Sequence, residues 1–207
     1  MNALELVKLS PVMPVIVVQD LDSAVSLARA LVAGGVRTLE ITLRSAAALD
    51  AIAAIRDQVP EALVGVGTVR TPQQLEAAQR AGACFGISPG LTETLAQAAQ
   101  ASGLPFLPGV STASEAMRAA ELGFNVQKLF PAEAVGGAAL LKAWHGPLPD
   151  LKFCPTGGIH AGNAASYLAL PNVACVGGSW LTPTATVADR QWDVITSLAR
   201  EACALAA

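Results

Sequence analysis

A single lysine stands in the middle of an otherwise apolar run, FNVQKLFPAE, from Phe124 to Glu133. The alternation of a β-strand predicts that Phe124, Val126, Lys128 and Phe130 share one face. If that face lines a buried interior, the loss of hydration lowers the pKa of the lysine, and a neutral amine becomes available as a nucleophile near pH 7. Lys128 is therefore a candidate Schiff-base lysine. The alternative is a lysine at a strand end with its ammonium group in water.

A carboxylate and a guanidinium stand at the end of a second strand-like run, which reads LEITLR. Alternation predicts that Glu40, Thr42 and Arg44 lie on one face of this strand. A buried carboxylate near a lysine can carry protons, which makes Glu40 a candidate general acid and base. A structural ion pair between Glu40 and Arg44 is the alternative.

Hydroxyl groups and paired glycines follow four other strand-like runs. Thr68 ends the third run and Ser88-Pro89 ends the fourth, where each could contact a ligand or simply cap a strand. The last two runs end in Thr156-Gly157-Gly158 and Gly177-Gly178-Ser179. In (β/α)₈ enzymes the loops after strands seven and eight often bind a phosphate, because glycine lets backbone N–H groups approach closely. Tight turning alone is the alternative for either pair.

The elements that must position these groups alternate about eight times along the chain, which predicts an α/β fold with parallel strands. We expect strands over 13–18, 36–43, 62–69, 84–88, 104–110, 124–131, 151–155 and 173–177. We expect helices over 3–9, 21–33, 46–59, 92–100, 112–122, 137–144, 163–168 and 189–205, and another that begins at Thr71-Pro72. Such a chain closes most economically as a single (β/α)₈ TIM barrel domain over 1–207. A doubly wound open sheet is the alternative, but the first strand lacks the glycine-rich turn of a dinucleotide site.

Composition limits the partners of the chain. Hydrophobic residues make up 53% and charged residues 14% of the 207 positions, and so little polar surface predicts a homo-oligomer. The net charge is −3 with no basic run, so we expect no nucleic acid and no membrane partner. Because no signal peptide or membrane span is visible, we expect a cytoplasmic protein. The four cysteines show no metal-ligand spacing, and we expect reduced core residues at positions 84, 154, 175 and 203.

Seven stretches carry a resemblance to a known family: PVIVV at 14–18, LEITLR at 39–44, VGVGTV at 64–69, ISPGLTE at 87–93, KLFPAE at 128–133, FCPTGGI at 153–159 and VGGSWL at 176–181. Over nearly its whole length the chain resembles the bacterial 2-keto-3-deoxy-6-phosphogluconate (KDPG) aldolases, class I aldolases of the Entner–Doudoroff pathway. The resemblance implies that Lys128 is the Schiff-base lysine and Glu40 the general acid and base. It also implies substrate contacts from Arg44, Thr68, Pro89, Phe130, Thr156, Gly157, Gly158, Gly178 and Ser179.

The reaction that the resemblance implies is the cleavage of KDPG to pyruvate and D-glyceraldehyde 3-phosphate, with neither metal nor cofactor, in a homotrimer. Cleavage of 4-hydroxy-2-oxoglutarate to pyruvate and glyoxylate is a second possible activity of the same class. Two other readings stay open at this point. One is an isomerase or synthase that acts on a phosphorylated sugar through the same phosphate site, and the other is a non-catalytic sensor of a phosphorylated metabolite.

Overall fold

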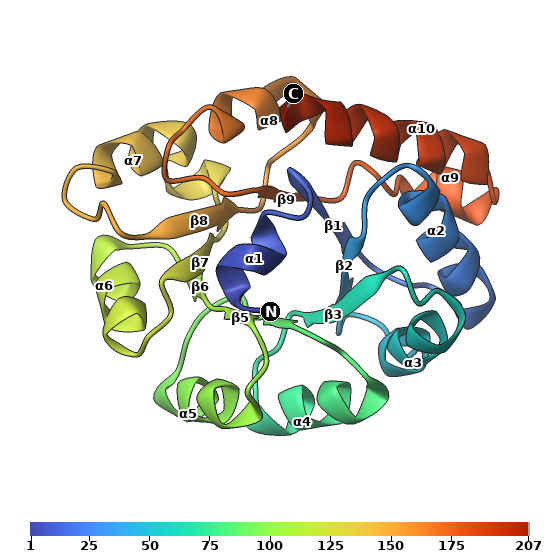
Figure 1. The fold of residues 1–207 in the computed structure, drawn as a ribbon, viewed down its shortest axis with the longest axis horizontal. Coiled ribbons are helices and arrows are strands. Elements are labelled where there is room, and N and C mark those ends of the chain that lie inside the picture. Colours follow the sequence, from blue (N-terminus) through green and yellow to red (C-terminus); the bar gives the residue numbers. More distant parts are fainter. Residues whose placement is uncertain (207) are drawn as a thin grey trace.

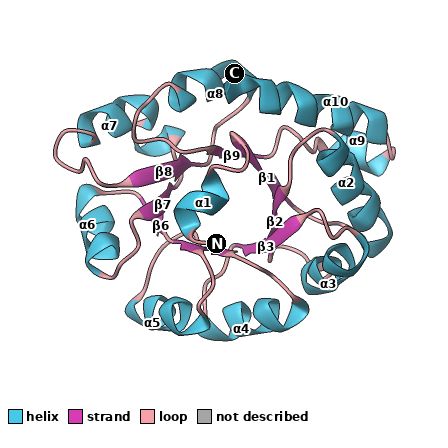
Figure 2. Ribbon diagram, viewed as in Figure 1, coloured by secondary structure: helices cyan, strands magenta, loops and turns pink. Residues whose placement is uncertain are grey.

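Parallel strands alternate with helices throughout residues 1–206, the part of the chain that the computed structural model describes (Figures 1 and 2). The strands are β1 (Val12–Ile16), β2 (Thr38–Thr42), β3 (Leu63–Gly67), β4 (Gly86–Ile87), β5 (Phe106–Leu107), β6 (Gly109–Val110), β7 (Val126–Leu129), β8 (Lys152–Pro155) and β9 (Val176–Gly178). Every strand pair among them is parallel. The predicted α/β class with parallel strands is therefore confirmed.

The strands are hydrogen-bonded in two sheets. A six-stranded sheet has the order β5-β4-β3-β2-β1-β9, and a three-stranded sheet has the order β6-β7-β8. Two isolated parallel bridges, Phe153 with Val173 and Thr156 with Gly177, connect the β8 segment to the β9 segment. In Figure 1 the strands surround the short helix α1, and the other helices lie outside them.

The helices are α1 (Ala3–Val7), α2 (Leu21–Ala33), α3 (Ala48–Gln58), α4 (Pro72–Ala81), α5 (Glu93–Ser102), α6 (Ala113–Glu121), α7 (Gly137–Trp144), α8 (Ala161–Leu168), α9 (Thr184–Ala188) and α10 (Trp192–Cys203). Side-chain caps begin several of them, because an oxygen one position before the helix accepts an otherwise unpaired N–H. Asp20 caps α2, and Thr71, Thr92 and Thr112 cap α4, α5 and α6. Within residues 1–206 no helix is both long and apolar enough to cross a bilayer.

Two hydrophobic clusters lie on the two faces of the strands. The larger cluster joins the outer strand faces to the helices. The smaller cluster includes Leu6 of α1 together with Met13, Phe85, Cys154 and Cys175. Because residues from strands far apart in the sequence meet in this second cluster, the strands share an inner face, and α1 covers one end of it.

Most predicted elements differ from the observed ones by a few residues at their ends, and a short 3₁₀ helix, Glu133–Val135, was not predicted. Three further differences concern the arrangement of the chain. The predicted strand over 104–110 is divided into β5 and β6 at Pro108, which lacks the N–H that a continuous strand would donate. Helix α9 falls where no element was expected. Phe124 was expected to share a face with Lys128, but it precedes β7 and packs against Phe106 in the outer cluster, with ring centroids 6.0 Å apart.

Candidate active site

Lys128 and Glu40 form a buried ion pair between two distant strands. Lys128 lies on β7 and Glu40 on β2, and their exposed fractions are 4% and 1%. The distance from Lys128 Nζ to Glu40 Oε1 is 3.3 Å. The ammonium also lies 5.2 Å from the centroid of the Phe130 ring. The structure therefore excludes a lysine with its ammonium in bulk water, and the partner of Glu40 is Lys128 rather than Arg44.

Gly67 makes the position of Glu40 possible. Glu40 pairs in register with Gly65, and Gly67 is two residues further along the same face of β3. A Cβ built on Gly67 would lie 2.6 Å from Glu40 Cγ and 2.7 Å from Cδ. The Glu40 carboxylate therefore occupies the space that any larger residue at 67 would fill.

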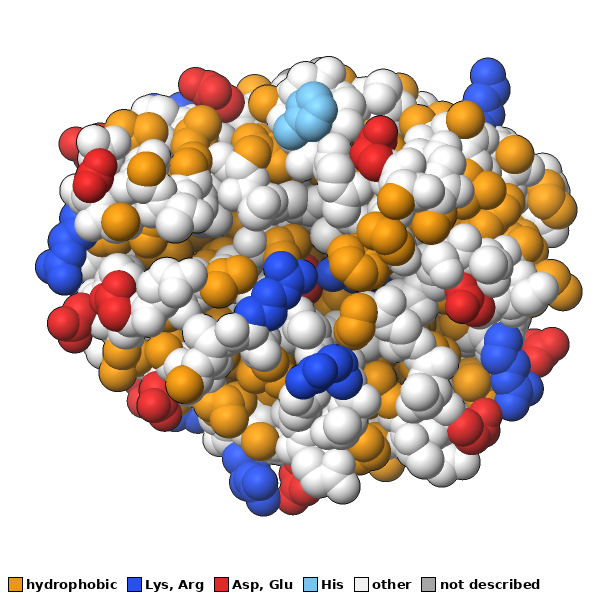
Figure 3. Space-filling view, turned by 180° about the vertical axis from the view of Figure 1, so that it is seen from behind, with side chains coloured by type: hydrophobic (Ala, Val, Ile, Leu, Met, Phe, Trp, Pro, Cys, Tyr) orange, Lys and Arg blue, Asp and Glu red, His pale blue; other side chains and the backbone are white. Residues whose placement is uncertain are grey.

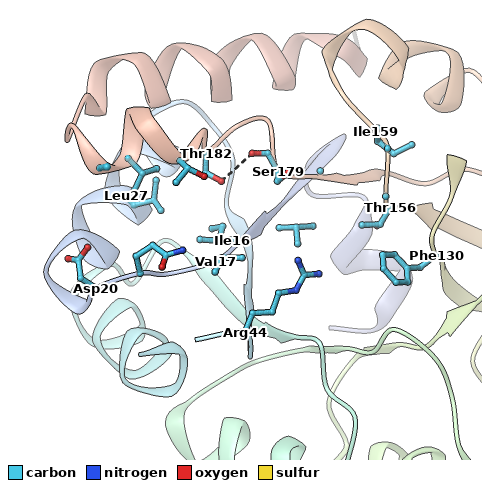
Figure 4. Close-up of a pocket in the computed structure, with 18 residues that line it drawn as sticks. Ile16, Val17, Asp20, Leu27, Arg44, Phe130, Thr156, Ile159, Ser179 and Thr182 are labelled. Carbon is cyan, nitrogen blue, oxygen red and sulfur yellow. Dashed lines mark hydrogen bonds between the residues drawn. The ribbon is translucent and has the colours of Figure 1, made fainter. Parts of the chain in front are cut away.

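A cavity of about 480 Å³ opens at this end of the strands (Figure 4). Lys128 and Glu40 do not line it themselves, but its wall includes Phe130, whose ring centroid lies 5.2 Å from Lys128 Nζ. Seven of the predicted site residues line it: Arg44, Phe130, Thr156, Gly157, Gly158, Gly178 and Ser179. The side chain of Arg44 points into the space between Phe130 and Ser179 in Figure 4. Phe130 also borders the ion pair through its ring, and Thr156 lies two residues beyond Cys154, the register partner of Lys128. The amine, the guanidinium and the two glycine segments therefore belong to one region.

This region lies on the side of the molecule opposite α1. In Figure 3, which views that side, Lys and Arg side chains gather around a hollow near the middle of the face, and hydrophobic side chains form much of its rim. The hollow combines positive charge with apolar walls, which suits a small organic anion.

The loop after β8 has an unusual backbone conformation. Gly157 and Gly158 have φ angles of +99° and +81°, a region that side-chain-bearing residues rarely adopt. The carbonyl of Gly157 accepts the N–H of Glu133 at 3.1 Å, and the carbonyl of Gly158 accepts the Asn163 Nδ2 group at 3.0 Å. Both carbonyls are thus bound by the protein, while the two glycines line the cavity.

Thr68 and Pro89 follow β3 and β4 at the same end of the strands but do not line the cavity. Thr68 has a φ angle of +63°, which is uncommon for a residue with a branched side chain and costs roughly 1–3 kcal/mol. The backbone of Pro89 lies against Gly109. A substrate contact from either residue stays a prediction.

Two buried thiols lie among the inward-facing residues near the ion pair. Cys154 Sγ is 3.9 Å from Thr156 Oγ1. A hydrogen bond that the Cys175 thiol donates to Cys154, and then burial, raise the pKa of Cys175 well above its usual range, so it stays protonated at neutral pH. All four cysteines of the described residues are free, as predicted, although Cys84 and Cys203 are only partly buried.

The sequence did not indicate eleven of the residues that line the cavity: Val15, Ile16, Val17, Gln19, Asp20, Leu27, Ile159, Thr182, Thr184, Val187 and Ala188. Ile16 and Val17 line it at the end of β1, where the strand-end rule could have indicated them. Val187 and Ala188 line it from α9. No polar or periodic signal marks this second pair in the sequence.

Comparison with known proteins gives a consistent result. The family model described as "KDPG and KHG aldolase" matches residues 4–198. The KHG/KDPG aldolase of Escherichia coli strain K12 is 55% identical over 192 residues, which cover 93% of this chain and 90% of that protein. The 2-dehydro-3-deoxy-phosphogluconate aldolase of Pseudoalteromonas atlantica is 52% identical over 197 residues, which cover 95% of this chain and 92% of that protein.

A solved structure agrees with the sequence comparison. The crystal structure of KDPG aldolase from Legionella pneumophila, with pyruvate captured as a covalent carbinolamine intermediate, superposes with a TM-score of 0.96. It is 46% identical in sequence, and the match covers 98% of each chain. This chain therefore belongs to the KDPG and KHG aldolase family.

Proposed function

We propose that this chain is a class I aldolase that cleaves KDPG to pyruvate and D-glyceraldehyde 3-phosphate through a Schiff base on Lys128. The observation that carries the proposal is the buried contact of 3.3 Å between Lys128 Nζ and Glu40 Oε1, with the amine 5.2 Å from the ring of Phe130, a residue of the cavity wall. The carbinolamine that pyruvate forms in the Legionella structure is the intermediate expected from such an amine. An isomerase or synthase is not favoured, because its chemistry would not need a buried amine.

The reaction begins when the neutral Lys128 amine attacks the C2 carbonyl of the substrate. Glu40 accepts the proton that the ammonium gives up, and it returns a proton to the carbinolamine oxygen so that water leaves and an iminium forms. The Glu40 carboxylate then takes the proton of the C4 hydroxyl, the C3–C4 bond breaks, and its electron pair moves into the iminium. The aldehyde leaves, the enamine is protonated at C3, and water hydrolyses the iminium to pyruvate and free Lys128.

Binding groups at the two ends of the cavity would align the substrate for this step. Arg44 offers a guanidinium fork that matches a carboxylate, and Thr68 would add a hydroxyl contact. The N–H groups of the two glycine segments, with the Ser179 hydroxyl, would bind the phosphate. Thr156, which lines the cavity next to the first glycine segment, would control the face of the enamine that meets the aldehyde.

Cleavage of 4-hydroxy-2-oxoglutarate is a second activity that we propose for the same site. The Escherichia coli relative that is 55% identical carries both substrates in its name. The lysine, the carboxylate and the guanidinium would act unchanged on this substrate, because it presents the same 2-keto acid group. Only the phosphate contacts would be unused.

We also propose that residues 1–207 form one domain whose strands close into an eight-stranded barrel. The N–H of Lys128 is donated to the carbonyl of Pro108 at 2.9 Å, which supports counting β5 and β6 as one interrupted strand. The bridges Phe153 with Val173 and Thr156 with Gly177 support contact between β8 and β9. With both connections the two sheets would form one ring, as in a (β/α)₈ fold.

Two further proposals concern the protein in the cell. The low charged fraction of 14% supports a homotrimer, since apolar surface would be covered between subunits. Sedimentation at several concentrations would test this, and a monomer at all of them would contradict it.

We propose a cytoplasmic location because a phosphorylated sugar acid carries too much charge to cross a membrane unaided.

The test of the proposed function compares two lysines on neighbouring strands. Lys128→Met should abolish the cleavage of KDPG, measured as pyruvate released in a coupled assay. Lys152→Met is the matched control, because Lys152 lies on β8 and its amine donates to the Pro171 carbonyl at the surface. Lys152→Met should keep wild-type turnover. Cleavage by the Lys128→Met protein would contradict the proposal.

A further inference from the structure

The loop Gly157–Gly158 is contacted from its outer side by Glu133. A Cβ built on Gly158 would lie 2.5 Å from Glu133 Cγ and 2.7 Å from Glu133 Cβ. The stem of Glu133 thus fills the space that a side chain at 158 would occupy. Glu133 does not line the cavity, whereas both glycines do. It therefore supports the loop from behind and does not meet a ligand in the cavity.

Tyr167 fixes the carboxylate of Glu133. The Tyr167 hydroxyl donates a hydrogen bond to Glu133 Oε1, and the tyrosine ring lies on α8 with an exposed fraction of 1%. Burial, and then the Glu133 carboxylate, raise the pKa of Tyr167, so its hydroxyl keeps the proton that it donates. Gly137 leaves room for the pair, because a Cβ there would lie 2.7 Å from Tyr167 Oη.

The pair adds a contact between three segments of the chain. Glu133 follows β7 by a short turn and lies five positions after Lys128 in the sequence, and its N–H is donated to the Gly157 carbonyl. Tyr167 lies on the helix that follows the glycine loop. On the other side of the loop, Asn163 of the same helix binds the Gly158 carbonyl. One carbonyl of the loop is therefore bound from the turn that follows β7, the strand of Lys128, and the other is bound from helix α8.

We propose that Tyr167 and Glu133 are positioning residues that hold the Gly157–Gly158 loop in the conformation that receives the phosphate of the substrate. This inference rests on the proposed function, which assigns the phosphate to that loop. Neither residue touches the reacting atoms. Loss of the pair should therefore weaken the binding of phosphorylated ligands and leave the chemistry at Lys128 intact.

The main test is the variant Tyr167→Phe, which removes one hydroxyl and keeps the buried ring. The loss of a hydrogen bond to a charged group should raise KM for KDPG about 10-fold. The kcat for KDPG and both constants for 4-hydroxy-2-oxoglutarate should change less than about 2-fold, because that substrate has no phosphate. Equal losses on the two substrates, or an unchanged KM for KDPG, would overturn the proposal.

Three companion variants separate positioning from general destabilisation. Glu133→Gln keeps an acceptor oxygen and the aliphatic stem, so its KM for KDPG should stay near the wild-type value. Glu133→Ala removes both and should raise KM for KDPG at least as much as Tyr167→Phe. The matched control is Thr196→Val, which also deletes a hydroxyl, one that donates to the Ala30 carbonyl at 3.0 Å between α10 and α2. It should lower thermal stability without favouring either substrate.

Direct binding distinguishes this inference from the proposed function. Binding of inorganic phosphate, followed by ³¹P nuclear magnetic resonance, should weaken about 10-fold in Tyr167→Phe. Reductive trapping of pyruvate on Lys128 should be the same in both proteins. If trapping succeeds but phosphate binds both proteins equally, the positioning role is wrong and the proposed function stands. If the wild-type protein is not trapped but phosphate binding still depends on Tyr167, the proposed Schiff-base function is wrong and the positioning role of Tyr167 stands.

Discussion

Gly67→Ala is a sharp test of the carboxylate's role, because it moves Glu40 without changing any group that could do chemistry. The new Cβ would lie 2.6 Å from Glu40 Cγ, whereas ordinary contact begins at 3.4 Å. The Glu40 stem must therefore shift by about 0.8 Å, the difference between these two distances. The contact between Lys128 Nζ and Glu40 Oε1 is 3.3 Å long, so a shift of this size would change its length and angle enough to disrupt it.

Displacement of a catalytic group by about 1 Å can cost on the order of 10² in rate, and we expect kcat for KDPG to fall by about that factor in Gly67→Ala. The substitution also overpacks the interior, which should lower the free energy of unfolding by about 1–3 kcal/mol. Coupled turnover assays and thermal unfolding measure the two effects separately.

Two other variants complete this experiment. Gly146→Ala is the control, since a Cβ at that exposed position would meet nothing within 4 Å, and both its rate and its stability should match the wild type. Glu40→Gln keeps the shape but not the charge, and it should lower kcat by about 10² to 10⁴. A Gly67→Ala protein that is destabilised yet turns over at the wild-type rate would refute the role assigned to Glu40.

Three further predictions follow from single contacts. Arg44→Lys should raise KM for both substrates about 10-fold, because an ammonium cannot bind a carboxylate in two places; an effect on one substrate alone would contradict this. Ser179→Ala should raise KM for KDPG and leave that for 4-hydroxy-2-oxoglutarate unchanged in the same coupled assay. Glu115 accepts the Ser111 N–H at 2.7 Å at the start of α6, and this bond chiefly lowers its pKa below 4.5. The carboxylate form of Glu115 is therefore favoured by folding, and at pH 7 Glu115→Gln should lower the free energy of unfolding by about 0.5 kcal/mol, a small value because the group is exposed. Denaturant titrations should show the difference between the two proteins disappearing as the pH falls below 4.5 and Glu115 becomes protonated.

The alternation of strands and helices was predictable because it depends on local sequence features such as helix caps, glycines and apolar runs. The bounds of α2 and α7 agree with the prediction, and an aspartate cap begins α2 while Gly35, with a φ angle of +97°, follows its end. The division at Pro108 was not predicted, because the flanking residues read as one apolar run. Helix α9 was missed because its five residues, TATVA, have neither a side-chain cap nor a full turn of apolar periodicity.

The residues of the site were predictable where chemistry and strand position coincide. A lysine and a glutamate late in apolar strands are conspicuous, and the structure brings them into contact. The packing that places them was not predictable. Gly67 reads as an ordinary strand glycine, and Tyr167 reads as one more buried aromatic on a helix. Their significance appears only when residues distant in the sequence are brought together.

The most direct measurement is reductive trapping of the wild-type protein with pyruvate and borohydride, followed by peptide mapping. Reduction of the Schiff base should add one stable pyruvate-derived mass per chain, on the peptide that contains Lys128 and at that residue alone. A protein of unchanged mass, or an adduct on another lysine such as Lys152, would contradict the claim that the buried amine of Lys128 carries the reaction.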